Sequence, residues 1–187
     1  MKFKISPFIS FVTSHILFLC LLFILPAISQ NYDLAAILAH KQAAFYNLIA
    51  ETGARSAIKI PILEPSIISI IKNAPQGFLT CFTRPFLTDT GSFLITISAL
   101  ENIFVIILGL YAIYTSKIIV IKRNILPYFC LFYTITFFTL IGLVTPVMGA
   151  IVRYKAQALP FLLIFFIILM QAPLKSVIQK LKIKNIS

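Results

Sequence analysis

The stretch FLITISALENIFVIILGLYAIY, residues Phe93–Tyr114, decides the fold class of this chain. It holds a single charged residue, Glu101, and about 20 apolar residues in a helix are enough to cross a hydrocarbon layer of about 30 Å. Of the 187 residues, 60% are hydrophobic and 11% are charged, which is too apolar a composition for one soluble core. Three more stretches have the same apolar character, namely Ile5–Ile28, Ile125–Val144 and Ala156–Leu174. The sequence therefore predicts an all-α integral membrane protein with about four transmembrane helices.

The basic residues predict how these helices are oriented. If all four stretches span, one side carries nine basic and no acidic residues: Lys2, Lys4, Lys117, Lys122, Arg123, Lys175, Lys180, Lys182 and Lys184. Such residues are retained in the cytoplasm, so we expect a multi-pass protein of the bacterial inner membrane with both termini cytoplasmic. The net charge of +11 does not indicate a nucleic-acid partner, because most aromatic residues lie inside apolar runs rather than beside a basic stripe.

The chain divides into three parts on this interpretation. Residues 1–29 form a transmembrane anchor, with a cleaved signal peptide as the alternative because small residues at 27–29 suit a cleavage site. Residues 30–91 form an outward segment of short amphipathic helices that lies in the membrane interface. Residues 92–187 form a three-span bundle with a basic cytoplasmic tail.

Local signals place the helices of the outward segment. Asp33 is expected to cap the start of a first helix and Gly53 to end it. Further helices are expected to start at Pro65 and at Pro75, because proline suits the first helical turn. The spacing predicts that the apolar face of the first helix consists of Leu34, Ile37, Leu38, Phe45, Leu48 and Ile49.

No pattern in the sequence predicts a catalytic residue, a metal site or a cofactor. The two histidines are far apart, and Cys20, Cys81 and Cys130 have neither metal-ligand nor disulfide-type spacing. With six glycines, the chain offers no phosphate-binding loop. We therefore expect that this chain alone is not catalytic, and that Cys81 is accessible from the outer side.

Glu101 is the main candidate within the membrane. It lies eight residues into its stretch, about 12 Å from the outer end, where a carboxylate is costly and usually faces protein. His15 on the first stretch is the expected partner, with Thr134 and Thr136 as hydrogen-bond donors. The carboxyl group either serves a proton-coupled site or holds helices together.

A second candidate is a set of outward basic residues, Arg84, Arg153 and Lys155. Arginine side chains match the oxygens of a phosphate group, so these residues are candidates for contact with a lipid phosphate. The alternative is that the long side chains simply reach toward lipid headgroups.

Two segments resemble a known family. Arg153-Tyr154-Lys155 followed by Leu159–Leu163 resembles the closing span of bacterial polytopic envelope-polysaccharide proteins, among them integral-membrane C-type glycosyltransferases and related Bacteroidetes proteins. Arg84-Pro85-Phe86 followed by Leu100-Glu101-Asn102 is similar to a segment before the last spans of such proteins. The resemblance implies a polyprenyl-phosphate-linked sugar as ligand and a C-terminal part, or an accessory or truncated component, of envelope glycan metabolism.

The resemblance transfers no catalytic residue. Those glycosyltransferases carry a catalytic acid in the first outward loop of a longer chain, a context that Asp33, Glu51, Glu64 and Asp89 do not share. Two other functions stay open from the residues themselves. One is a structural or assembly subunit of a larger membrane complex without its own ligand, and the other is a small proton-coupled transport component that uses Glu101 and His15.

Overall fold

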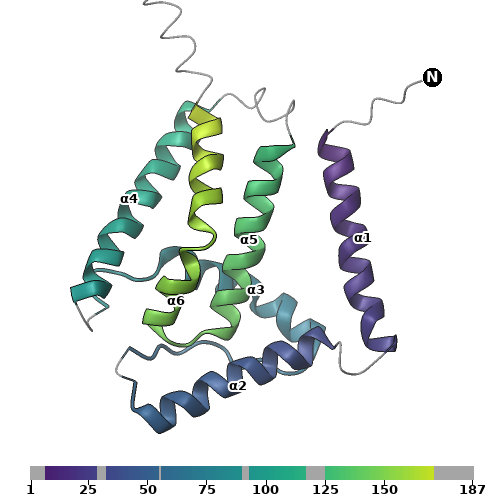
Figure 1. Cartoon of the computed structure of the whole chain (residues 1–187), viewed down its shortest axis with the longest axis vertical. Helices are drawn as coiled ribbons and strands as arrows, with labels where there is room; N and C mark the ends of the chain where they lie inside the picture. Colours follow the sequence, from purple (N-terminus) through teal and green to yellow (C-terminus); the bar gives the residue numbers. More distant parts are fainter. Residues whose placement is uncertain (1–6, 29–32, 55, 90–92, 117–124, 171–187) are drawn as a thin grey trace, which may run out of the picture.

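The computed structural model describes residues 7–28, 33–54, 56–89, 93–116 and 125–170, and in them it confirms the all-α prediction. The described part contains no β-strand, only an isolated bridge between Ala57 and Val147. Six helices carry labels in Figure 1, and a seventh, unlabelled and yellow-green, spans Leu159–Met170. The labelled helices are α1 (Pro7–Ile28), α2 (Leu34–Thr52), α3 (Ile67–Thr83), α4 (Phe93–Thr115), α5 (Leu126–Val144) and α6 (Met148–Lys155).

Two helices, α4 and α5, are long and apolar enough to cross a membrane. A third crossing exists if α6 and Leu159–Met170 are taken as one span, bent by 54° at the break between them. Phe8–Leu17 in α1 is a shorter apolar helix. The described residues thus give two or three candidate spans, slightly fewer than the four predicted. The last predicted span is a bent pair that begins earlier than Ala156, and its end beyond Met170 lies outside the described residues.

The outer surface of α4 is apolar, as expected of a helix in contact with lipid. Phe93, Leu94 and Tyr114 are 78%, 72% and 89% exposed, whereas the residues facing the bundle recur every three or four positions. A soluble protein rarely exposes so continuous an apolar face. The inward-facing residues of α4 are Ile95, Ala99, Asn102, Val105, Gly109 and Ala112.

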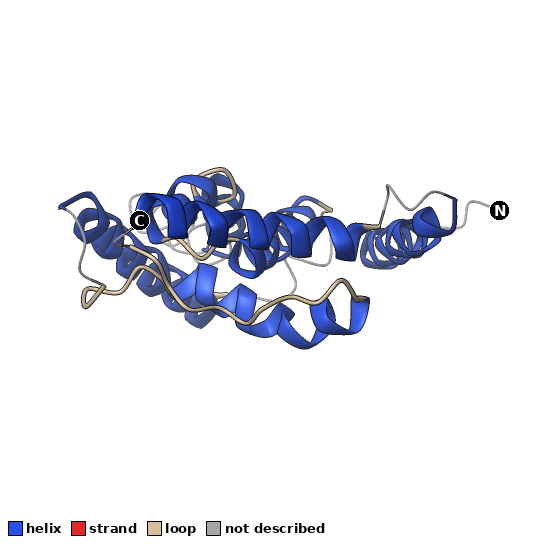
Figure 2. Ribbon diagram, turned by 90° about the horizontal axis from the view of Figure 1, so that it is seen from below, coloured by secondary structure: helices blue, strands red, loops and turns tan. Residues whose placement is uncertain are grey.

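The long helices run side by side and α2 crosses one end of them (Figures 1 and 2). The starts of α1 and α5 and the ends of α4 and Leu159–Met170 lie together at the opposite end (Figure 1). Helix α1 packs against α5 through aromatic contacts, with ring centroids of Phe11 and Phe132 5.8 Å apart. The outward segment therefore covers one end of the bundle.

Both predicted ends of α2 are confirmed. The carboxylate of Asp33 accepts hydrogen bonds from the backbone N–H groups of Ala35, at 2.9 Å, and Ala36, at 3.2 Å. Gly53 adopts a left-handed conformation with φ of 62°, and its N–H donates to the carbonyl of Ile49 at 2.9 Å. These two contacts are local, so sequence spacing alone is sufficient to find them.

The residues of the predicted apolar face of α2 fall into two groups, one packed on the bundle and one exposed. The buried residues are Ala35 and Gln42, while Leu34, Ile37 and Leu48 are 36%, 41% and 49% exposed. Of the predicted residues, Leu38 and Phe45 pack on a cluster formed by Leu63, in the chain between α2 and α3, and by Leu143 and Val144 of α5. The side of α2 that packs on the bundle has the polar residue Gln42 at its centre, so the predicted residues farthest from Gln42 around the helix stay exposed.

The Gln42 side chain joins α2 to two distant segments. Its Nε2 donates to the carbonyls of Pro61, at 2.9 Å, and Leu143, at 2.7 Å, and its Oε1 accepts from the N–H of Leu63 at 2.8 Å. The extended chain before Pro61 also pairs with the turn after α5, since the N–H of Ile58 donates to Pro146 at 2.8 Å. Because the buried Gln42 amide makes all three of these hydrogen bonds, its burial stabilises the contact of α2 with the extended chain and α5.

The expectation that separate helices start at Pro65 and Pro75 is wrong. One helix, α3, begins after Ser66, whose hydroxyl accepts from the N–H of Ser69 at 3.2 Å, and it continues through Pro75. Proline inside a helix removes one hydrogen bond and costs about 3 kcal/mol. The close packing of α3 along α5 offsets that cost, because Gly77 and Gly142 let the two backbones touch.

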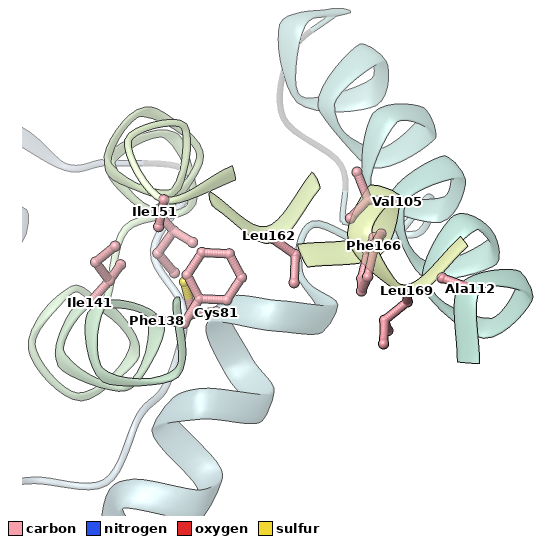
Figure 3. Close-up of a cluster of buried hydrophobic side chains, with 10 residues drawn as sticks. Cys81, Val105, Ala112, Phe138, Ile141, Ile151, Leu162, Phe166 and Leu169 are labelled. Carbon is pink, nitrogen blue, oxygen red and sulfur yellow. The ribbon is translucent and has the colours of Figure 1, made fainter. Parts of the chain in front are cut away.

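The hydrophobic core lies where α3, α5 and α6 meet and continues between α4 and Leu159–Met170 (Figure 3). Phe138 of α5 and Ile151 of α6 are both 0% exposed and lie beside Cys81 of α3 (Figure 3). Phe166 packs against α4 where Gly109 leaves room for its ring. The core therefore attaches the outward helix α3 to the candidate spans.

The glycine contact between α3 and α5 yields a test of this packing. A methyl group at Gly142 would overlap the carbonyl of Gly77, so Gly142→Ala should destabilise the protein by about 1–3 kcal/mol. Gly149→Ala is the matched control, because a Cβ there meets no atom within 4 Å. Thermal unfolding in detergent should show a clear decrease in Tm for Gly142→Ala only. Equal Tm values for the two variants would contradict the packing.

Candidate functional site

Lys155, at the end of α6, is buried and fully hydrogen-bonded. Its side chain is 4% exposed, and Nζ donates to the carbonyls of Phe82 and Arg84, each at 3.2 Å. The third acceptor is the side-chain oxygen of Asn102 on α4. An ammonium group has three N–H donors, so this set of acceptors satisfies all of them. The ring centroid of Phe138 lies 5.6 Å from Nζ.

Asn102 completes the arrangement by donating to α3. Its Nδ2 lies 2.6 Å from the carbonyl oxygen of Thr83, between the two carbonyls that bind Lys155. We call Lys155, Asn102 and the carbonyls of residues 82–84 the lysine cap. The last carbonyls of a helix have no partner within it and carry partial negative charge, so a cation there is favourable. The lysine cap thus joins α3, α4 and α6.

The three predicted phosphate contacts do not converge on one point. Lys155 lies in the interior with its donors used by protein carbonyls. Arg153 is exposed, and its guanidinium lies 5.3 Å from the ring centroid of Tyr154. The Arg84 backbone belongs to the lysine cap, while its side chain turns to Asp89. The sequence does not show whether a lysine such as Lys155, at the end of a short helix, is buried or exposed.

The loop after α3 positions the Arg84 side chain. Its Nη1 lies 3.1 Å from Oδ1 of Asp89, and the other oxygen of Asp89 accepts from the N–H of Phe86 at 2.7 Å. The guanidinium also lies 5.5 Å from the ring centroid of Phe86. Asp89 thereby closes the loop and fixes the orientation of Arg84.

Arg84 lines a hollow at the end of the bundle that carries the outward segment. This outer hollow has a volume of about 340 Å³, and Ser56, Lys59 and Thr88 are among its other polar residues. Asp89 lines it as well, together with apolar Ile95 at the start of α4. Two cations, one carboxylate and two hydroxyls leave the lining with a net positive charge, which suits an anionic group. Lys59 has no distinctive sequence signal, because only the fold brings residues 56–59 beside Arg84.

Glu101 lines a second and much smaller hollow. This inner hollow has a volume of about 20 Å³, and it is also lined by Ser98, Asn102 and Lys155. Glu101 itself is exposed at the surface of α4. The structure therefore brings Glu101 to Lys155 and not to the predicted partner His15.

His15 lies between α1 and α5. Its Nδ1 is 2.7 Å from the carbonyl oxygen of Phe11, and its ring centroid is 3.8 Å from that of Phe132. Thr136 lines the same hollow as His15, whereas Thr134 is buried and donates to the carbonyl of Cys130 at 2.8 Å. Neither threonine lines the hollow that Glu101 lines.

The expected accessibility of Cys81 is wrong. Cys81 is 0% exposed in the last turns of α3, and its burial raises the pKa of the thiol to about 12, against the opposing effect of Lys155. A thiol with so high a pKa is a poor nucleophile at neutral pH. Among the residues that the structure describes, no group of three or more His, Cys, Asp or Glu side chains is arranged to hold a metal ion.

Comparisons with protein-family models, curated proteins and solved structures found no match to this chain. The resemblance to envelope-polysaccharide proteins therefore stays a prediction from the sequence. What the structure adds is the geometry of the two hollows and of the lysine cap between them.

The lysine cap can be tested through Cys81. Lys155→Met leaves the carbonyls of Phe82 and Arg84 without a donor, at about 1–3 kcal/mol for each buried group, so the end of α3 should loosen. Maleimide should label Cys81 in this variant but not in the parent protein, as measured by mass spectrometry in membranes. Lys72→Met removes an exposed lysine of α3, the helix that contains Cys81, and serves as the control. Cys81 should stay unlabelled in this variant. Labelling of the parent, or equal protection of Lys155→Met, would refute the assigned role of the cap.

Proposed function

We propose that this chain is a multi-pass membrane protein that binds the phosphate group of a polyprenyl-linked sugar in its outer hollow, as an accessory or truncated component of envelope glycan metabolism. The observation that carries the proposal is the outer hollow itself. It combines Lys59 and Arg84 with two hydroxyl groups in about 340 Å³, a volume within the usual range of small-molecule sites.

The charges of the outer hollow favour a phosphate or pyrophosphate group. Asp89 occupies one nitrogen of the Arg84 guanidinium at 3.1 Å and orients the group, which has further N–H donors. Lys59 adds a second cation, and the hydroxyls of Ser56 and Thr88 are neutral donors. Charge-assisted hydrogen bonds to phosphate are among the stronger polar contacts that proteins make.

The surroundings of the outer hollow favour a lipid over a free anion. Phe86 and Leu87 are 45% and 57% exposed in the loop between Arg84 and Thr88. Phe93 and Leu94 are exposed at the start of α4, next to Ile95 of the hollow. A polyprenyl chain attached to a phosphate in the hollow would have an apolar helix face beside it.

This proposal gives the other basic residues separate roles. Lys155 does not touch the lipid and instead fixes the backbone of Arg84. Arg153 is exposed on α6 and extends toward neighbouring headgroups. No catalytic residue is assigned, so the chain would act beside an enzyme that uses the same lipid-linked sugar.

We further propose that the protein lies in the bacterial inner membrane with both termini in the cytoplasm. Support comes from the helix ends that lie together in Figure 1, because the nine basic residues adjoin those ends in the sequence. The outer hollow would then face away from the cytoplasm, at the end covered by α2.

The binding proposal predicts a loss of affinity for undecaprenyl phosphate when the cations of the outer hollow are removed. Each charge-assisted contact contributes about 1.5–3 kcal/mol, so Lys59→Ala should weaken binding by at least about tenfold and Lys59→Ala/Arg84→Ala by at least about a hundredfold. Binding to the protein in lipid nanodiscs would be measured by native mass spectrometry.

Two controls make this measurement specific. Lys72→Ala removes an exposed lysine outside the outer hollow and should leave the affinity unchanged. Undecaprenol, which lacks the phosphate, should bind weakly to parent and variants alike. If Lys59→Ala/Arg84→Ala binds undecaprenyl phosphate as well as the parent, the proposed site is wrong.

The orientation proposal predicts the behaviour of fusions at the C-terminus. A fluorescent protein fused there should mature and emit in intact cells, whereas alkaline phosphatase, which folds only outside the cytoplasm, should be inactive. A fusion within the loop near Lys59 should give the opposite result. An active C-terminal phosphatase would overturn the proposed orientation.

A structural or assembly subunit without its own ligand is the second candidate. The observation that favours it is the ion pair between Arg84 and Asp89, which already neutralises one of the two cations of the outer hollow. Absence of binding in the parent protein would support this candidate. No contact in the structure favours the proton-coupled alternative, because Glu101 and His15 line different hollows.

A further inference from the structure

Glu101 and Lys155 line the same inner hollow from two different elements. Glu101 lies on α4, and Lys155 lies at the break between α6 and Leu159–Met170. The two side chains make no direct ion pair, but both contribute to the lining of the inner hollow.

Each of the two charges is costly in an apolar environment unless an opposite charge lies nearby. Lys155 is buried, and the carbonyl groups of the lysine cap supply dipoles but no negative charge. Of the other titratable groups near it, the Cys81 thiol is neutral and the Arg84 guanidinium is paired with Asp89. Glu101 is exposed on a helix that we assign to lipid, where an unpaired carboxylate is costly. Pairing removes the net charge from both.

We infer that Glu101 is the counter-ion of Lys155 and that the inner hollow between them binds one water molecule. A volume of about 20 Å³ meets the minimum of about 10–15 Å³ that one water requires. A bound water also needs two to four polar partners. The hollow supplies the Glu101 carboxylate, the Ser98 hydroxyl and the Asn102 amide.

The existing hydrogen bonds leave these partners free to bind a water. The Ser98 hydroxyl donates to the carbonyl of Leu94 at 2.9 Å, and its oxygen keeps lone pairs that can accept. One N–H of the Asn102 amide donates to Thr83, which leaves the second N–H as a donor. The water would thus receive a hydrogen bond from Asn102 and donate to Glu101 and Ser98. This site is independent of the lipid-phosphate binding proposed for the outer hollow.

Chemical labelling of Glu101 tests the pairing. Dicyclohexylcarbodiimide is an apolar reagent that requires a protonated carboxyl group, so an ionised counter-ion reacts slowly. Lys155→Gln removes the cation and should raise the labelling of Glu101 at neutral pH, as measured by mass spectrometry. Lys155→Arg keeps the charge and should label as slowly as the parent. Fast labelling of Glu101 in the parent would overturn the inference.

A double-variant cycle tests the same pair through stability and does not depend on the reagent. If the charges compensate each other, the decrease in Tm of Glu101→Gln/Lys155→Gln should be smaller than the sum of the two single decreases. The control cycle combines Glu101→Gln with Lys72→Gln, an exposed lysine that does not line the inner hollow, and should be additive. Additivity of the Glu101 and Lys155 changes would refute the pairing.

Discussion

The contact between the Lys155 ammonium and the end of α3 is the constraint on which the outward segment depends. The last carbonyls of α3 have no partner within the helix, and their hydrogen bonds to Lys155 and Asn102 are partly buried. In an apolar environment each unpaired carbonyl costs several kcal/mol, so the helix needs donors from elsewhere in the chain. Lys155 and Asn102 supply donors to three successive carbonyls, those of residues 82, 83 and 84.

Gln42 has the corresponding role at the other end of the outward segment. Its amide joins α2 to the extended chain at Pro61 and to the last turn of α5 at Leu143. Two buried polar side chains, one on α2 and one on α6, therefore fix the outward segment to the candidate spans. Both contacts are hydrogen bonds to defined backbone carbonyls, so they fix the positions of residues 33–54 and 56–89 more specifically than apolar contacts alone would.

The sequence predicted the features that depend on near neighbours. The all-helical class and the stretches of α4 and α5 follow from composition, and the ends of α2 follow from Asp33 and Gly53. Glu101 lies in α4, one of the candidate spans, and is exposed there. Its expected partner was wrong, because choosing between His15 and Lys155 requires knowing which helices pack together.

The features that the sequence could not predict depend on contacts between distant residues. Pro75 ordinarily ends or begins a helix, yet it lies inside α3, two residues before Gly77, which packs on Gly142 65 positions later in the chain. The buried position of Gln42 requires the carbonyl of Leu143, 101 residues away. Lys155 looked like an outward cation because its acceptors belong to α3 and α4, separated from it by 53 residues or more.

Arg84 connects the two proposed sites through a single residue. Its carbonyl accepts from Lys155 in the lysine cap, and its guanidinium lines the outer hollow beside Asp89. Because both the backbone and the side chain are already held, a phosphate group would meet an arginine whose conformational freedom is lost before binding. Preorganisation of this kind lowers the entropic cost of association, since a free arginine side chain would otherwise be immobilised by the ligand. In the proposed function, the buried lysine would therefore favour anion binding at the outer hollow by holding the backbone of Arg84 in place.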